Sequence, residues 1–225
     1  MGHTVTQLVP LGIGMIVSPV PLAALIAILL SARAKTNAKV FTVTAMAASV
    51  LIVGVTVFTS KAGADRASAA AHPGQIVFAT VFGLVFVVLA ALSWRSRPKS
   101  GAVAAMPSWM AQIDTMDAGR TAILSLLLTV PNAKNLPLEL KAGALIAEAH
   151  LPAAQAALLT VGFAALAGLG LIALTVLAAI PSKRVAAALG VVKEELILHN
   201  AAIMTVLFLL LAGLQASHLV TALTA

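Results

Sequence analysis

Residues 18–21 read Ser-Pro-Val-Pro and lie in the middle of the first hydrophobic span of the chain. A second break bounded by prolines, Val-Pro-Asn-Ala-Lys-Asn-Leu-Pro at residues 130–137, lies in the corresponding place of the second half. In transporters built from repeated halves, interrupted helices of this kind meet at the bilayer midplane and form the binding site. The pair of breaks therefore predicts a transport site.

The composition predicts an all-α integral membrane protein. Hydrophobic residues make up 61% of the 225 positions and charged residues only 9%, far from the balance of a soluble domain. A helix needs ~20 apolar residues to cross ~30 Å of hydrocarbon. The stretches that are longer than this and contain no Lys, Arg, Asp or Glu are residues 1–32, 40–60, 73–94, 149–182 and 196–225. Residues 121–148 form a sixth span although they contain charged side chains.

The six spans divide into two halves of three. We expect transmembrane helices near residues 5–31, 38–60, 74–94, 120–149, 152–180 and 198–222. An odd number of spans before the repeat gives the second half the opposite topology, so we predict two inverted three-helix repeats with helices one and four broken at mid-membrane. The predicted parts are a first repeat at residues 1–94, a cytoplasmic linker with a short amphipathic helix at 95–119, and a second repeat at 120–225.

The distribution of basic residues predicts the orientation of the chain. Ten of the fourteen Lys and Arg residues lie in the loops that follow helices one, three and five, which accounts for the net charge of +7 without a nucleic-acid partner. By the positive-inside rule, both termini of this multi-pass protein face outward from the cytoplasmic membrane. The absence of Cys excludes thiolate metal sites and thiol redox chemistry, and no P-loop is present. We therefore expect no metal, no cofactor and no enzymatic activity.

The first break resembles the start of a new helix. Ser18 suits the N-cap, where its side chain can accept backbone N–H groups, and Pro19 suits the first helical position. The partial positive charge of a helix N-terminus at this depth would stabilise an anion. Ser18, Pro19 and Pro21 are therefore candidate substrate-binding residues, and a simple proline kink is an equally weighted alternative.

The second break adds charge at membrane depth. Lys134 and Lys141 each carry an insertion cost of ~2.5–3.5 kcal/mol, so they are expected to face protein or water. We predict that Lys134 faces the substrate, with Asn132 and Asn135 lining the site. Lys141 is a second candidate that could instead snorkel toward the interface.

Glu139 has two interpretations of equal weight. It is a candidate for proton coupling, because an acid within a membrane span is commonly functional. If Leu136 caps the second half-helix and Pro137 opens it, Glu139 falls in the first turn, where an acid is favourable for structural reasons. It could also neutralise a lysine.

Four polar residues near helix ends are candidates for a cytoplasmic entrance. Arg33 and Asn37 lie at the cytoplasmic end of helix one, and His199 and Asn200 open the last helix. The simpler interpretation is anchoring at lipid headgroups for the first pair and an interfacial helix start for the second.

Together these residues resemble the actinobacterial GAP or Sap family, the peptidoglycolipid and sulfolipid addressing proteins. The matching elements are Ser18-Pro-Val-Pro-Leu, then Ser31, Arg33, Asn37 and Phe41, then Pro131-Asn-Ala-Lys-Asn-Leu-Pro-Leu, and finally His199-Asn-Ala-Ala-Ile-Met. The resemblance covers nearly the whole chain, and Ala133 stands where the family commonly has proline. It implies membership of the lysine-exporter superfamily, six helices as two inverted repeats, often a homodimer, and movement of glycolipids to the cell surface.

The sequence thus predicts a transporter or flippase that moves an anionic cell-envelope glycolipid, or a polyprenyl-phosphate-like lipid, by alternating access. Export of a small solute such as an amino acid is one alternative. A membrane scaffold that recruits lipid-synthesis or secretion proteins is another. The expected partners are the anionic lipid substrate, membrane lipids, a second copy of the chain and a protein of lipid synthesis or secretion.

Overall fold

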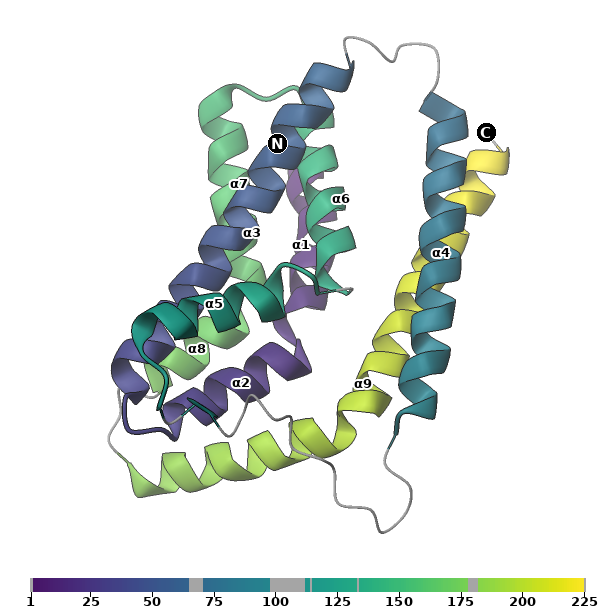
Figure 1. Cartoon of the computed structure of the whole chain (residues 1–225). Helices are drawn as coiled ribbons and strands as arrows, with labels where there is room; N and C mark the ends of the chain where they lie inside the picture. The colour runs from purple at the N-terminus through teal and green to yellow at the C-terminus, as the bar shows by residue number, and fades with distance from the viewer. Residues whose placement is uncertain are drawn as a thin grey trace. The chain divides into compact units, whose positions relative to one another are not determined.

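The computed structural model describes residues 2–64, 71–97, 112–113, 115–132, 134–177 and 182–224, and over these residues the chain is all-helical (Figure 1). The helices are α1 (Gly2–Ile16), α2 (Pro19–Leu29), α3 (Ala34–Ala64), α4 (Ala71–Arg95), α5 (Ala118–Thr129), α6 (Asn135–Glu148), α7 (Ala153–Ala167), α8 (Leu169–Leu177) and α9 (Lys183–Thr224). The all-α prediction is therefore confirmed.

Several of these helices are long and apolar enough to cross a membrane. Ala34–Ser60 of α3 and Arg184–Ser217 of α9 meet both criteria, and the bent pairs α1/α2 and α7/α8 raise the number of candidate spans to four if each pair counts as one. These helices fit a membrane protein. The count of six spans and the inverted repeat stay predictions.

The fifth and sixth predicted helices differ from the structure. The fifth helix, expected to run unbroken over residues 152–180, bends by 58° between α7 and α8. The last helix, expected to start near residue 198, begins at Lys183, because residues 183–197 contain no proline and are rich in helix-forming Ala, Leu and Glu. The fourth begins at Ala118, close to the predicted residue 120. Most of the predicted linker, at residues 98–111 and 114, lies outside the described residues.

The chain forms two compact units, and each unit takes helices from both predicted halves. The first comprises Met1–Ala62 and Ala105–Ile197, and the second comprises Gly63–Ala104 and Leu198–Ala225. In the first unit, α1 packs against α6 and α7, while α2 packs against α5 and α8. The two predicted breaks therefore belong to the same unit.

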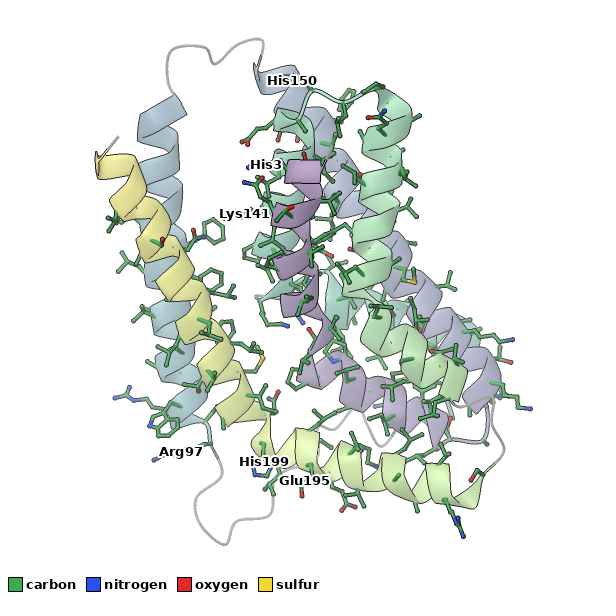
Figure 2. The ribbon with its side chains drawn as sticks, turned by 180° about the vertical axis from the view of Figure 1, so that it is seen from behind. His3, Arg97, Lys141, His150, Glu195 and His199 are labelled. Carbon is green, nitrogen blue, oxygen red and sulfur yellow. The ribbon has the colours of Figure 1, made fainter. Side chains whose placement is uncertain are left out.

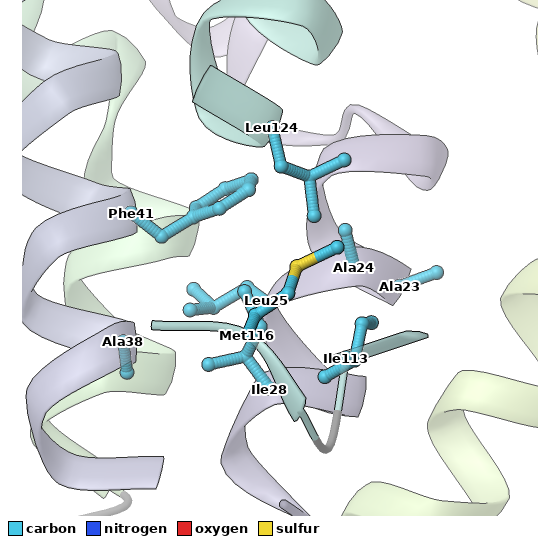
Figure 3. Packing of buried hydrophobic residues seen from close by; sticks show 9 residues of the cluster. All are labelled: Ala23, Ala24, Leu25, Ile28, Ala38, Phe41, Ile113, Met116 and Leu124. Carbon is cyan, nitrogen blue, oxygen red and sulfur yellow. The ribbon is translucent and has the colours of Figure 1, made fainter. Parts of the chain in front are cut away.

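A buried apolar cluster fixes α2 in the first unit (Figure 3). The helix is apolar on all sides, as expected of one surrounded by protein. It contributes Leu25 and Ile28, which meet Phe41 of α3, Leu124 of α5 and Met116 just before α5. The cluster ties the chain before α5 to the helix that follows the first break.

Polar side chains cross-link the same region. The Asn37 side chain donates to the Met116 carbonyl at 2.9 Å, and the buried Ser125 hydroxyl donates to the Phe41 carbonyl at 2.8 Å. In an apolar environment such groups must find partners within the protein. These bonds anchor α3 to the chain just before α5 and to the second half of α5.

Aromatic packing holds the second unit. The rings of Phe86 on α4 and Phe208 on α9 stack with centroids 6.2 Å apart, and both side chains are buried. Thr205 of α9 also reaches the Ala90 carbonyl of α4 at 3.5 Å. The described side chains of this unit thus pack mainly through apolar contacts.

Candidate functional site

The first break lies where it was predicted. The α1/α2 pair bends by 56°, Ser18 is the N-cap of α2, and Pro19 is its first residue. We predicted that the Ser18 side chain accepts a backbone hydrogen bond from α2, but it accepts none. Its hydroxyl instead faces two acceptors, Asn135 Oδ1 at 3.1 Å and the Met15 carbonyl at 3.4 Å. The break in the first span is thus bonded directly to the break in the fourth.

The start of α2 offers few backbone donors. Pro19 and Pro21 have no N–H, so Val20 is the one residue of the first three that carries a donor. The next residue with an N–H, Leu22, donates to the Ser18 carbonyl at 3.0 Å. The prolines that start the helix therefore also remove most of the donors that could hold an anion.

The carbonyl end of α1 is bound by Lys134. Its Nζ donates to the Gly14 carbonyl at 2.7 Å and to the Val17 carbonyl at 2.8 Å. The last carbonyls of a helix have no partner within that helix and carry a partial negative charge, so a buried ammonium stabilises them. Lys134 is only 1% exposed. The substrate-facing role predicted for this lysine stays a prediction, and in this conformation the ammonium binds protein.

Asn132 organises the second break. Its Oδ1 accepts the backbone N–H groups of Lys134 and Asn135, both at 3.2 Å, and its carbonyl accepts from Leu136 at 2.9 Å. The half-helix α6 begins at Asn135 with Lys134 at its N-cap, so the condition that Leu136 caps this helix is not met. Asn132 satisfies the first donors of α6 because it reaches across the turn in place of a cap side chain.

Glu139 lies deeper in α6 than predicted. With α6 starting at Asn135, its first turn contains no acid, which removes the helix-start explanation. The side chain is 4% exposed and interacts with the Ser49 hydroxyl of α3. That geometry falls short of a full hydrogen bond, because both Ser49 Oγ and Glu139 Oε2 lack a hydrogen-bond partner.

The α3 face that meets Glu139 was missed from the sequence. Ser49, Val53 and Thr56 follow one another at helical spacing, which places them on one face of α3. On α6, Gly143 lies one turn after Glu139, and a Cβ there would come within 2.5 Å of Thr56 Cβ. The available signal was the spacing of Glu139 and Gly143, four residues apart on α6. A glycine one turn from a polar residue indicates that another helix packs closely on that face.

Lys141 is separate from the junction of the two breaks. It lies seven residues after Lys134 on α6, about 10 Å along the helix axis, on the part of the helix nearer His150 (Figure 2). Its side chain is half-buried and interacts electrostatically with Glu148. The structure therefore does not bring it together with Ser18 and Lys134.

The entrance candidates have different environments. Asn37 is buried and bonded to the linker end, whereas Arg33 is exposed. His199 is exposed on α9 (Figure 2), and the neighbouring Asn200 has a buried Oδ1 without a hydrogen-bond partner. Asn37 thus tethers one segment to another, and its entrance role stays a prediction, as it does for the other three residues.

Comparison with known proteins identifies the family. Searches of curated proteins and of solved structures found no match. The model of one family, described as Sap, sulfolipid-1-addressing protein, matches residues 8–218. That match includes both breaks, the polar residues that join them and most of α9. The chain therefore belongs to the Sap, sulfolipid-1-addressing protein, family.

Proposed function

We propose that this protein is a transporter that moves an anionic envelope lipid across the cytoplasmic membrane by alternating access, with both termini outside. The family description names a sulfolipid, whose headgroup is an anion. A lipid of this class can leave its acyl chains in the bilayer while only the charged headgroup passes through protein. The chain needs a polar path for that headgroup alone.

The observation that carries this proposal is the polar junction between the two breaks. Ser18 bonds to Asn135, and Lys134 bonds to the carbonyl end of α1. Charged and polar groups within a membrane span are expensive and usually belong to a transport path. The junction would stabilise the fold of a scaffold as well, but two helix breaks that meet at a buried cation are the arrangement of a transport site, and this favours transport over the scaffold alternative.

The grouping of helices supports a repeat mechanism. The first unit contains the predicted helices one, two, four and five, and the second contains most of helices three and six. Two inverted repeats related by a pseudo-twofold axis would exchange one with four, two with five, and three with six. Each unit therefore consists of complete pairs of helices that such an axis would exchange. This grouping is compatible with alternating access in a protein of two inverted repeats.

Glu139 is our candidate for the coupling proton. It is buried, and its Oε2 has no hydrogen-bond partner. The helices α1 and α7, which pack against α6, and residues 40–60 of α3 carry no Asp, Glu, Lys or Arg. A carboxyl in this position can exchange one proton when α6 and α3 separate and water enters.

Reconstitution of the full chain tests the proposal. Closed vesicles would contain phosphatidic acid with a fluorophore on one acyl chain, and a membrane-impermeant quencher would report the labelled lipid in the outer leaflet over time. We expect translocation by the unmodified chain and by Lys39→Met, which changes an exposed lysine, and a loss of about tenfold or more for Lys134→Met. Lipid movement no faster than in empty vesicles, together with uptake of free lysine, would instead establish the solute exporter.

A further inference from the structure

We propose that Lys134 is a latch that selects for anionic headgroups: its ammonium holds the first break closed through the Gly14 and Val17 carbonyls, and a headgroup oxyanion opens the break by replacing them. This inference rests on the proposed function. It gives the buried lysine a role in each of two states, bound to protein in the first and to the substrate in the second.

The closed state is the one described by the structure. The ammonium donates at 2.7 Å and 2.8 Å to carbonyls on either side of the last turn of α1, distances typical of charge-assisted hydrogen bonds. Gly14 and Val17 lie 120 and 117 residues before Lys134. The lysine therefore joins the end of α1 to the start of α6.

Several other donors near the junction are already engaged. Asn132 accepts the backbone N–H groups of Lys134 and Asn135, and the Ser18 hydroxyl faces Asn135 and Met15. Among the residues that the structure describes at this junction, Lys134 is the one cation. An anion that arrives here gains most by binding its ammonium.

Opening without an anion is unfavourable. Moving α1 away would leave a buried ammonium and two buried carbonyls unpaired at once, and each unpaired group has a desolvation penalty. A sulfate or phosphate headgroup supplies several oxygens that accept charge-assisted hydrogen bonds, so it can replace both carbonyls. A zwitterionic headgroup replaces them less well, since its phosphate is a diester whose charge is offset by the headgroup's own ammonium.

This exchange couples the substrate to the conformation. A ligand shifts a two-state equilibrium only through its different affinity for the two states. Here the anion binds an ammonium that is free only when the break is open. The latch therefore keeps the path closed in a membrane of zwitterionic lipid and opens it for the anionic class.

The test uses the absence of Cys from the chain. A single Ser18→Cys substitution places a buried thiol at the break, and its labelling rate by a small maleimide reports opening in vesicles. One set would contain only dioleoyl phosphatidylcholine, and the other would also contain dioleoyl phosphatidic acid, which has the same acyl chains. Glycerol 3-phosphate added to the first set supplies the same phosphate without the lipid. Thr36→Cys, at an exposed position of α3, is the matched reporter.

We expect phosphatidic acid to raise the labelling of Ser18→Cys by about tenfold, comparable to the loss of one charge-assisted hydrogen bond, and to leave Thr36→Cys unchanged. Adding Lys134→Met should make labelling fast in both lipids, and Lys134→Arg should retain the lipid response. An effect of glycerol 3-phosphate equal to that of the lipid would support the latch and identify the phosphate group as the trigger.

Two results would overturn the latch. One is equal labelling of Ser18→Cys in both lipids with Lys134 intact, a result that does not depend on whether Lys134→Met folds. The other is a normal lipid response in folded Lys134→Met. If labelled phosphatidic acid still crosses the membrane in either case, the latch fails while the proposed function stands. If the break opens but no lipid crosses, the proposed function fails.

Discussion

The bends at Ser18 and Gly168 have nearly the same angle, 56° and 58°, but different chemistry. At Gly168 the backbone hydrogen bonds continue through the bend, because Gly168 donates to Ala164 and Ile172 donates to Gly168, both at 2.9 Å. At Ser18 two residues lie between the helices, and carbonyls at the end of α1 are bonded by side chains. A bend becomes a candidate site only where it separates the backbone from its own partners.

The two bends also pack together. A Cβ on Gly170 of α8 would lie 2.8 Å from the Ile16 carbonyl at the end of α1. The absence of a side chain at this glycine lets α8 approach the break directly. The apolar α7/α8 bend thus packs directly against the polar α1/α2 bend.

Replacing Lys134 should have the largest effect on the free energy of unfolding. The effect should arise at the bend at Ser18, because the Lys134 ammonium donates to carbonyls at the end of α1. Lys134→Met keeps the length and most of the volume of the side chain but leaves the Gly14 and Val17 carbonyls without their donor. Each buried carbonyl left without its donor costs ~1–3 kcal/mol, so the loss of both costs ~2–6 kcal/mol. We expect the free energy of unfolding, measured by titrating the detergent-solubilised chain with SDS, to fall by about that amount.

Two variants determine whether the charge or the contact matters. Lys134→Arg keeps the cation and its donors, so it should recover part of the lost stability. Lys39→Met, at an exposed position, should change the free energy of unfolding by less than about 0.5 kcal/mol. A Lys134→Met variant as stable as the unmodified chain would show that the carbonyls of the first break need no cation.

Disrupting the packing of α8 against the end of α1 should have the next largest effect on the free energy of unfolding. Gly170→Ala places a methyl group against the Ile16 carbonyl, and overpacking of this kind costs ~1–3 kcal/mol. Gly162→Ala is the matched control on α7, since a Cβ there meets nothing within 4 Å. It should be neutral or stabilise the helix by up to about 1 kcal/mol. Equal SDS midpoints for the two alanine variants would contradict the packing of α8 against the break.

Local signals explain which parts of this arrangement could be predicted. Proline acts on its own neighbours, so Pro19 and Pro137 were enough to locate both breaks. Gly168 carries no comparable signal, because glycine is common and tolerated in membrane helices. Its bend accompanies close packing, with Met46 Cγ 3.3 Å from the site of a Cβ. The bend therefore depends on a partner that is distant in sequence.

The partner of Lys134 was beyond sequence reasoning for a similar reason. Its cost at membrane depth predicted only that it faces protein or water, and its ammonium donates to two protein carbonyls. The acceptors, however, are backbone carbonyls, which every residue possesses, so no residue type marks them. Ser18 was predicted as a cap from its place before Pro19, but its bond to Asn135 depends on tertiary contact between two breaks.

The bond between Ser18 and Asn135 should give the smallest effect and the most direct measure of whether the breaks act as one site. A double-mutant cycle of Ser18→Ala, Asn135→Ala and the combined variant isolates their interaction from the separate contacts of each side chain. For a neutral hydrogen bond at 3.1 Å, we expect a coupling of ~0.5–1.5 kcal/mol in the free energy of SDS unfolding. Repeating the cycle in the Lys134→Met background sharpens the comparison. If the lysine holds the breaks together, the coupling should fall toward zero, because the two side chains no longer meet at a fixed distance. A coupling that is unchanged without the lysine would mean that the neutral bond alone positions the first break against the second.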